Sequence, residues 1–319
     1  MEVDKILFGD CRETLKEFDG KVRMCVTSPP YYGLRDYGTA TWVGGDPNCN
    51  HMRDSKVKPE NCITGHKNHD KMAGVGDAIY KTVCPKCGAV RQDSQIGLEE
   101  TPEEYIENLV SVFRSVRDVM TDDGTLWVNI GDSYYNYRPG KGQALPKQTV
   151  SKTKQDLPDE CAKRGNKLEG LKEKDLIGIP WMLAFALRAD GWYLRQDIIW
   201  HKPNPMPESV KDRCTKSHEY IFLLSKNRKY YYNNEAIKEP VKQDWGTRDR
   251  TKGKYHNPGT GLVPHSGLSK SYTTKNKRSV WSVTTKPYKS AHFAVFPPDL
   301  IEPCIKAGSE EGDIVLDPF

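Results

Sequence analysis

Short runs of apolar residues, each closed by polar or turn-forming residues, recur along the whole chain. The segment 219–225, EYIFLLS, is almost continuously apolar, which is typical of a strand buried on both faces of a sheet. A similar run at 22–26, VRMCV, stops abruptly at Ser28 and two prolines. Further strands are predicted at residues 3–8, 125–130, 193–200 and 313–316.

Helical spacing of apolar residues separates these predicted strands. In the segment 101–119, Thr101 fits the N-cap, Pro102 the first helical position, and two glutamates follow at the positive end of the helix. Shorter helices are predicted at 11–18, 180–189 and 299–307. Because strands alternate with helices, we predict an α/β fold whose sheet is covered on both faces.

The corner after the strand at 22–26 has the first candidate chemistry. Pro29 and Pro30 fix two φ angles and remove two backbone N–H donors, so the chain leaves the strand in a rigid, extended turn. Such a turn holds the Ser28 hydroxyl and the Tyr31 ring in a fixed relation. An ordinary strand-ending turn explains the same four residues, so the rest of the chain must decide.

Asp10 follows the first predicted strand, at the kind of sheet edge where α/β proteins bind ligands. Two interpretations remain open: Asp10 accepts a hydrogen bond from a nucleoside, or it is the N-cap of the helix at 11–18.

A metal site is indicated between residues 49 and 87. Cys84 and Cys87 form a Cys-x-x-Cys pair followed by glycine, and Cys49 and His51 supply two more ligands for a structural zinc ion. Other candidates for the second pair are Cys62, His66 and His69. A redox dithiol is the alternative, although no thioredoxin-like βαβ pattern surrounds the pair.

Composition indicates a soluble protein. The chain has 319 residues, of which 36% are hydrophobic, and a mean hydropathy of −0.72. No apolar run approaches the length of a membrane span and the N-terminus does not resemble a signal peptide, so we expect a cytoplasmic location. Nine cysteines without an export signal suggest reduced thiols.

The net charge of +5 is unevenly distributed. Segment 241–289 holds eleven Lys and Arg residues against two Asp, and segment 138–174 holds ten basic against five acidic residues. Clustered basic residues favour a polyanion, and the aromatics interleaved in segment 241–289 suit contacts with DNA. A solvated charged loop is the simpler explanation of either segment.

Several blocks, in this order, resemble the β-group of amino-methyltransferases of restriction-modification systems and phages. Residues 28–31, SPPY, look like the catalytic motif, and 124–132 look like the strand motif that follows it. Residues 199–204 with Arg213 and 218–220 are similar to the later target-side block. Residues 293–300 resemble the segment before the cofactor motif, and 315–319, VLDPF, resemble the first half of that motif.

This resemblance implies a Rossmann-like sheet that binds S-adenosylmethionine and methylates double-stranded DNA. The implied catalytic residues are Ser28, Pro29, Pro30 and Tyr31. The expected cofactor-binding residues are Asp10, Thr27, Phe296, Asp317, Pro318 and Phe319. The expected DNA-binding residues are Lys202, Asn204, Arg213, Arg248, Arg250, Lys275, Lys277 and Arg278.

The resemblance also divides the chain into five parts. We expect a catalytic start at 1–48, a zinc insertion at 49–98, the rest of the catalytic core with a flexible basic loop (138–174) at 99–233, a target-recognition region at 234–290, and the start of the cofactor-binding half at 291–319. The glycine-rich half of the cofactor motif would follow Phe319. The expectation is therefore a truncated product or a second polypeptide that completes the motif, in a monomer or a dimer.

The expected reaction is transfer of a methyl group to an exocyclic amine of a flipped-out base. Ser28 in place of an aspartate favours N4 of cytosine, and N6 of adenine is the alternative. Methylation of cytosine C5 would need a thiolate, and the one Pro-Cys pair, Pro303-Cys304, lies inside a predicted helix and is interpreted as core. The rival from another class is an inactive, zinc-containing DNA-binding protein.

Overall fold

The computed structural model of the protein describes residues 4–33, 39–52, 80, 82–135, 168–241, 273–286 and 295–319. The chain divides into two compact units. The first unit comprises Met1–Pro29, Val110–Gly131 and Pro180–Phe319, and the second comprises Pro30–Leu109 and Asp132–Ile179.

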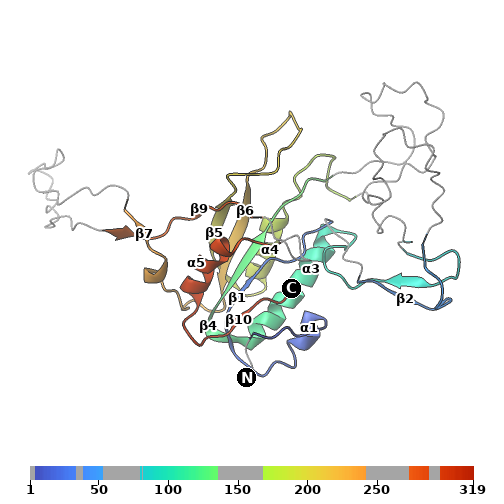
Figure 1. Cartoon of the computed structure of the whole chain (residues 1–319), viewed down its shortest axis with the longest axis horizontal. Helices are drawn as coiled ribbons and strands as arrows, with labels where there is room; N and C mark the ends of the chain where they lie inside the picture. The colour runs from blue at the N-terminus through green and yellow to red at the C-terminus, as the bar shows by residue number, and fades with distance from the viewer. Residues whose placement is uncertain are drawn as a thin grey trace, which may run out of the picture. The chain divides into compact units, whose positions relative to one another are not determined.

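A six-stranded sheet forms the centre of the first unit (Figure 1). Five of its strands run parallel, and β6 is antiparallel to both of its neighbours. Because β6 lies in the interior of the sheet, its almost continuous apolar run is buried, as the sequence predicted. In spatial order the strands are β10 (Val315–Leu316), β1 (Val22–Thr27), β4 (Met120–Ile130), β6 (His218–Ser225), β5 (Tyr193–His201) and β9 (Val280–Ser282).

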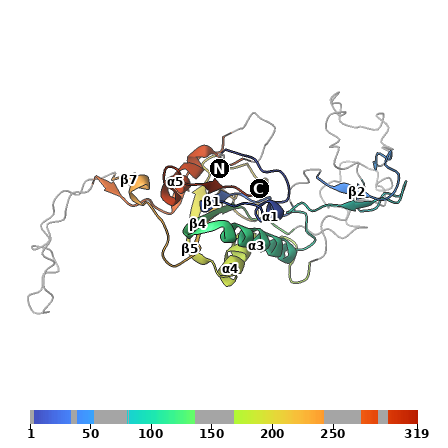
Figure 2. The same cartoon turned by 90° about the horizontal axis from the view of Figure 1, so that it is seen from below.

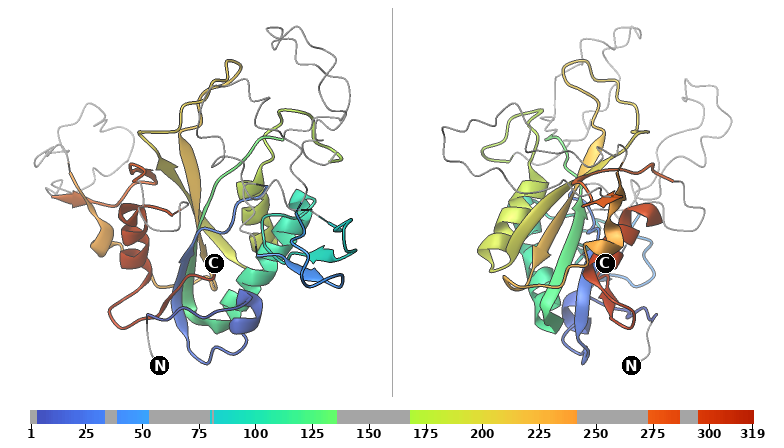
Figure 3. Two further views of the ribbon diagram at one scale, coloured as in Figure 1. Left: turned by 45° about the vertical axis from the view of Figure 1, so that its right-hand side comes forward. Right: turned by 90° about the vertical axis from the view of Figure 1, so that its left-hand side faces the viewer.

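Helices cover both faces of this sheet, as expected from the alternation of strands and helices. The helix α5 (Pro298–Gly308) lies on one face, and α4 (Ile179–Ala189) lies on the other (Figures 2 and 3). On the α5 side, the buried core includes Trp127, Trp200 and Trp281 together with apolar residues of α5. On the α4 side, Trp181 packs edge-on against the ring of Phe222 from β6, with ring centroids 5.3 Å apart.

The long helix α3 (Pro102–Val119) begins as the sequence predicted. The backbone N–H of Glu104 donates to Oγ1 of Thr101 at 3.2 Å, and the backbone N–H of Thr101 donates to the Glu104 carboxylate at 3.4 Å. This reciprocal pair is a capping box, which satisfies two of the N–H groups that a helix start leaves unpaired.

The smaller elements lie outside the main sheet. The second unit has a two-stranded antiparallel ladder of β2 (Thr41–Val43) and β3 (Val90–Gln92). The first unit also contains α1 (Cys11–Thr14), a 3₁₀ turn at Glu235–Ile237 and a short ladder of β7 (Glu239–Pro240) with β8 (Thr274–Lys275). In the part of the chain that the structure describes, no helix is both long enough and apolar enough to cross a membrane.

The strand predicted at residues 3–8 is wrong. Residues 4–8 form no strand, and the side chains of Ile6 and Phe8 are 79% and 90% exposed. Both edges of β1 are already paired, one with β10 and the other with β4, so the N-terminal segment has no place beside β1. The helix predicted at 11–18 is shorter than expected, since α1 ends at Thr14.

Several predictions fall outside the described residues. Residues 136–167, 242–272 and 287–294 are not described, and they hold most of the two basic segments, including Arg248 and Arg250. The alternative metal ligands Cys62, His66 and His69 lie there as well. Within the described residues, Cys304 is fully buried in α5, which confirms its interpretation as core.

Candidate functional site

The carboxyl ends of β1 and β10 meet at one edge of the sheet in the first unit. The two strands pair in parallel, with Met24 opposite Val315 and Cys25 opposite Leu316, so Thr27 and Asp317 arrive side by side. The hydroxyl of Thr27, which is fully buried, donates a 2.5 Å hydrogen bond to Oδ1 of Asp317. The sequence-predicted residues Thr27 and Asp317 are therefore brought together.

Asp317 has a distinctive environment at this edge. Its Oδ1 also accepts a hydrogen bond from the backbone N–H of Phe319 at 3.3 Å, whereas Oδ2 takes no hydrogen bond from the described residues. The residue as a whole is exposed, but protein atoms crowd the carboxyl group; this desolvation raises the pKa of Asp317, and the two hydrogen bonds only partly oppose it. A carboxylate with one oxygen held and the other open suits a ligand that donates a hydrogen bond.

The ring of Phe319 packs on the helix beside this edge. It meets the fully buried Phe113 of α3 edge-on, with ring centroids 6.1 Å apart. Ser28 and Pro29 follow Thr27 directly at the end of β1; Pro29 is buried and Ser28 is half-buried. The edge thus combines a carboxylate, a serine hydroxyl and an aromatic ring within one unit.

The second half of the SPPY motif belongs to the second unit. The hydroxyl of Tyr105, a buried residue of α3, donates to the backbone carbonyl of Pro30 at 2.8 Å. Burial raises the pKa of Tyr105 above its ordinary value, so this hydroxyl remains a donor at physiological pH. Tyr31 is half-buried next to this carbonyl.

A polar network that the sequence reasoning missed lies at the carboxyl end of β4. The side-chain amide of Asn129, which is 3% exposed, donates to the backbone carbonyl of Tyr220 at 3.1 Å and to the Glu219 carboxylate at 3.3 Å. Glu219 also pairs with the ammonium group of Lys202. The available signal was the asparagine itself, because a polar residue inside the apolar run TLWVNI needs a partner once it is buried.

Most of the described residues expected to bind DNA have partners within the protein. Lys202 pairs with Glu219 and also lies over the ring of Trp200, with Nζ 4.1 Å from the ring centroid. Arg213 pairs with Glu208. Three more of these residues have partners within the protein. Asn204 exchanges hydrogen bonds with the backbone of Thr285, and Lys277 and Arg278 both lie beside Glu239.

Two residues expected to bind cofactor have structural roles. Asp10 caps α1 by accepting from the backbone N–H of Arg12 at 2.9 Å. The hydrogen bond from the Arg12 side chain lowers the pKa of the Asp10 carboxyl. Phe296 packs against the hydrophobic core on the α5 side of the sheet. The helix-cap interpretation of Asp10 is thereby confirmed, and a role in cofactor binding remains a prediction for both residues.

The four predicted metal ligands come together in the second unit. The ligand atoms of Cys49, His51, Cys84 and Cys87 all lie within 4.8 Å of one another. The Sγ atoms of Cys49 and Cys84 are 3.8 Å apart, and Sγ of Cys87 lies 3.5 Å from Nδ1 of His51. Tetrahedral zinc with bonds of about 2.3 Å to sulfur places such ligand atoms about 3.8 Å apart. The spacing therefore fits a zinc ion.

The backbone passes close to the metal-ligand cluster at Gly45 and turns tightly between Cys84 and Cys87. Gly45 has φ of +71°, and a Cβ at this position would lie 2.8 Å from Sγ of Cys87. The backbone N–H of Gly88 donates to the carbonyl of Cys84 at 2.7 Å, which closes the turn between Cys84 and Cys87. No side chain other than hydrogen fits at Gly45, since the chain passes so close to the thiol.

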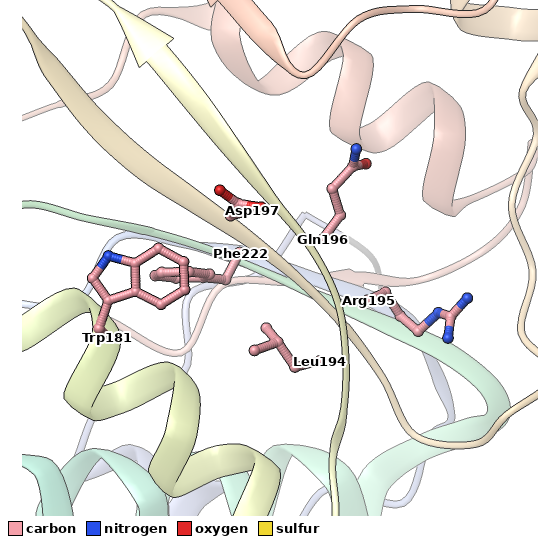
Figure 4. A pocket seen from close by; sticks show the side chains of 6 residues that line it. All are labelled: Trp181, Leu194, Arg195, Gln196, Asp197 and Phe222. Atoms are coloured by element: carbon pink, nitrogen blue, oxygen red, sulfur yellow. The ribbon is translucent and has the colours of Figure 1, made fainter.

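A cavity of about 220 Å³ lies elsewhere in the first unit (Figure 4). Trp181 projects from α4 over Phe222, and the rest of the lining comes from the first half of β5, residues Leu194, Arg195, Gln196 and Asp197. These residues precede the carboxyl end of β5, whereas α/β sheets bind ligands beyond that end. The cavity is therefore separate from the edge that holds Thr27 and Asp317.

Comparison with known proteins identifies the class to which this fold and site belong. The family model described as DNA methylase, for N6 and N4 methyltransferases, matches residues 22–319. The chain therefore belongs to the amino-methyltransferases of restriction-modification type.

Two curated relatives are similar to this chain over nearly all of its length. The chain is 40% identical over 312 residues to the type II methyltransferase M.Cfr9I of Citrobacter freundii, covering 98% of the chain and 74% of that protein. It is 41% identical over 321 residues to M.SmaI of Serratia marcescens, covering 99% of the chain and 78% of that protein. Among solved structures, the PvuII cytosine-N4-specific DNA methyltransferase matches with a TM-score of 0.49 and 13% identity, covering 97% of this chain and 72% of that one.

Proposed function

We propose that the protein transfers a methyl group from S-adenosylmethionine to the exocyclic N4 amine of cytosine in a flipped-out base of double-stranded DNA. The observation that carries this proposal is the hydrogen bond between Thr27 and Asp317, which places the serine-proline corner after β1 beside the carboxylate after β10. Direct methyl transfer requires the donor and the acceptor to be in contact. This edge holds candidate residues for binding each of them.

The chemical problem is the weak nucleophilicity of the amine, whose lone pair is delocalised into the base. Ser28 Oγ and the Pro29 carbonyl are acceptors for the two N–H hydrogens of the amine. Hydrogen bonds at these two positions favour a pyramidal nitrogen, in which the lone pair is available for attack. The ring of Tyr31 stacks on the flipped base and holds it in place.

The residues at the end of β10 fit the methyl donor. S-adenosylmethionine supplies an electrophilic methyl group when it is bound. Asp317 presents Oδ2, which takes no hydrogen bond from the described residues, to an ammonium or hydroxyl donor of this cofactor. The neighbouring aromatic residue Phe319 offers a ring face beside it, with Pro318 between them.

Cytosine rather than adenine is proposed because position 28 is serine. An aspartate would accept more strongly from the adenine amine, and the hydroxyl of Ser28 is the weaker acceptor. Nucleoside mass spectrometry of DNA from cells that express the protein separates the two reactions. N4-methylcytosine is expected, and N6-methyladenine without N4-methylcytosine would reassign the substrate.

Two substitutions test the catalytic assignment. Ser28→Ala and Tyr31→Ala are each expected to reduce methyl transfer at least ~100-fold. The first variant loses a positioned polar group, and the second loses the ring that holds the base in place. Ser94→Ala is the matched control, since Ser94 is an exposed serine of the second unit. Full activity in both site variants would remove this assignment, and absence of any transfer by the unmodified protein would favour a DNA-binding protein without activity.

The proposal includes a structural zinc ion held by Cys49, His51, Cys84 and Cys87. It is supported by the ligand spacing within 4.8 Å and by the glycine that the Cys87 thiol requires at position 45. Four protein ligands close the coordination sphere, which is typical of structural and not catalytic zinc. Plasma emission spectroscopy is expected to give about one zinc per chain, and a ratio near zero would remove the ion from the proposal.

The proposed DNA contacts include the expected basic residues Lys275, Lys277 and Arg278, together with Arg248, Arg250, Asn204 and Arg213. Lys202 is left out of this proposal because it pairs with Glu219. Arg278 is the strongest described candidate because its side chain is 64% exposed while it pairs with Glu239. Exposed basic side chains bind phosphate and release counterions, which makes the affinity depend on salt.

A further inference from the structure

Two described segments of the second unit link the metal-ligand cluster to the surroundings of the SPPY corner. The incoming arm comprises residues 39–51, which hold β2, Cys49 and His51, and the outgoing arm comprises residues 84–101, which hold β3 and lead to α3. The arms are paired by the β2–β3 ladder, in which Thr41 is opposite Gln92 and Val43 is opposite Val90.

Contacts from the outgoing arm hold the corner directly. The backbone N–H of Gly33 donates to the carbonyl of Gly97 at 2.8 Å, and the hydroxyl of Tyr32 donates to the carbonyl of Glu100 at 3.1 Å. Gly97 lies so close that a Cβ there would be 3.1 Å from the carbonyl oxygen of Tyr31. The outgoing arm therefore lies against the backbone of Tyr31 at Gly97.

Three apolar side chains near the described β2–β3 ladder are largely exposed. Val43, Val83 and Val90 are about half exposed, at 50%, 49% and 48%. A two-stranded ladder of three-residue strands is marginal in water when it has no buried face. A metal ion bound by the cluster would stabilise the ladder, because it would hold four residues from both arms at one point.

Two further contacts stabilise the arms between the cluster and the corner. The ring of Trp42, in the centre of β2, stacks on His51 with ring centroids 4.2 Å apart and an interplanar angle of 16°. Farther toward the corner, the hydroxyl of Thr39 donates to the carboxylate of Asp93 at 3.3 Å. The first contact ties β2 to the cluster within the incoming arm, and the second joins the incoming arm to the outgoing one, so order at the cluster constrains the segment that reaches Gly97.

We propose that the bound metal ion has a positioning role: it holds the two arms together and thereby fixes the Pro30–Tyr32 corner for the target base. The inference rests on the proposed function for the bound zinc ion and for the role of Tyr31 in base stacking. The metal acts through the β2–β3 ladder and the contact between Gly33 and Gly97, and it takes no part in the transfer step.

Hydrogen exchange measured by mass spectrometry tests the coupling without any DNA or cofactor. The amide of Gly33 donates to the Gly97 carbonyl, so its exchange is expected to be slow in the zinc-loaded protein. Removal of zinc with a chelator is expected to speed exchange of this amide at least ~10-fold, and return of zinc is expected to restore the protection. Amides of the β4–β6 ladder in the first unit are expected to keep their protection.

A pair of cysteine variants separates the ligand role from general effects of cysteine loss. Cys84→Ser is expected to lose zinc and to accelerate exchange at Gly33, whereas Cys214→Ser, at an exposed cysteine outside the cluster, is expected to change neither. If Cys84→Ser does not fold, chelation and return of zinc in the unmodified chain still test whether the metal slows exchange at Gly33.

Three results would overturn the proposal. They are absence of zinc, a disulfide between Cys49 and Cys84 detected by intact mass, or unchanged exchange at Gly33 after complete zinc removal. These readouts do not depend on methyl transfer. A zinc-loaded protein with the expected exchange pattern but without N4-methylcytosine product would contradict the proposed reaction and leave the coupling intact.

Discussion

The hydroxyl of Thr27 donates a 2.5 Å hydrogen bond to Asp317, a residue 290 positions later in the chain. The bond joins the ends of two parallel strands that share one edge of the sheet. Because Thr27 is completely buried and Asp317 has an oxygen open to a ligand, the pair fixes the carboxylate in place relative to the corner that begins at Ser28.

Replacing the threonine by an isosteric residue tests this link. Thr27→Val removes the hydroxyl and keeps the volume, so it is expected to lower the free energy of unfolding by about 1–3 kcal/mol through loss of a hydrogen bond to a charged acceptor. Urea unfolding followed by circular dichroism measures the change. Affinity for S-adenosylmethionine, measured by titration calorimetry, is expected to fall as well.

Thr27→Ser is the matched control because it retains the hydroxyl. It is expected to keep cofactor affinity near that of the unmodified protein while losing some stability from the missing methyl group. Equal cofactor affinity in the valine and serine variants would show that the hydrogen bond to Asp317 does not prepare the site.

Tyr105 offers a test on the other side of the motif. Tyr105→Phe removes the donor to the Pro30 carbonyl and leaves that acceptor unpaired, so a destabilisation of about 1 kcal/mol is expected. Methyl transfer is expected to slow several-fold with cofactor affinity unchanged, because Tyr105 positions the corner without touching the carboxylate edge. A steady-state assay at saturating cofactor measures the first effect and calorimetry the second. A variant with unaltered transfer rate would contradict the positioning role.

Arg278 and Lys202 allow a comparison between an exposed and an enclosed basic residue. Arg278→Ala is expected to weaken binding to sonicated duplex DNA and to reduce the slope of log affinity against log salt by about 1. Its stability is expected to change by no more than about 0.5 kcal/mol, since the side chain is 64% exposed.

Lys202→Ala is expected to behave in the opposite way. The Lys202 and Glu219 side chains are only 19% and 16% exposed, so loss of the cation leaves an enclosed carboxylate and costs about 2 kcal/mol of stability. The salt slope of DNA binding is expected to stay the same. Fluorescence anisotropy at several salt concentrations, combined with urea unfolding, distinguishes the two variants, and an equal loss of slope in both would place Lys202 on the DNA.

Local pattern predicted the central elements because their determinants are local. The apolar run of β6 and the N-cap Thr101 at the start of α3 are visible in a few consecutive residues, and the structure confirms both. The strand predicted at 3–8 failed for a nonlocal reason: its residues have suitable types, but both edges of β1 are occupied by strands from distant parts of the chain.

The candidate site divides in the same way. The residues of the SPPY corner and the four metal ligands could be named from short motifs, since few other residue types perform their chemistry. The network of Asn129 and Glu219 and the pairing of Lys202 could not, because they depend on which strands become neighbours. Sequence alone therefore assigned Lys202 to DNA without showing that Glu219 already balances its charge.

The helix α5 packs closely on the sheet at Gly308, its last residue, and this contact gives a test of the core. A Cβ at this position would lie 2.9 Å from Oγ1 of Thr125, 3.0 Å from Sδ of Met24 and 3.1 Å from Nε1 of Trp127. Gly308→Ala would gain up to about 1 kcal/mol from helix propensity, but overpacking of this kind costs about 1–3 kcal/mol and also strains the hydrogen bond between Trp127 and Thr125. A net loss of about 1–2 kcal/mol is expected in urea unfolding, together with a change in tryptophan fluorescence.

Lys306→Ala, at an exposed position of the same helix, is the control and is expected to cost no more than about 0.5 kcal/mol. A stabilised Gly308→Ala variant would mean that α5 packs less closely on β1 and β4 than these distances require.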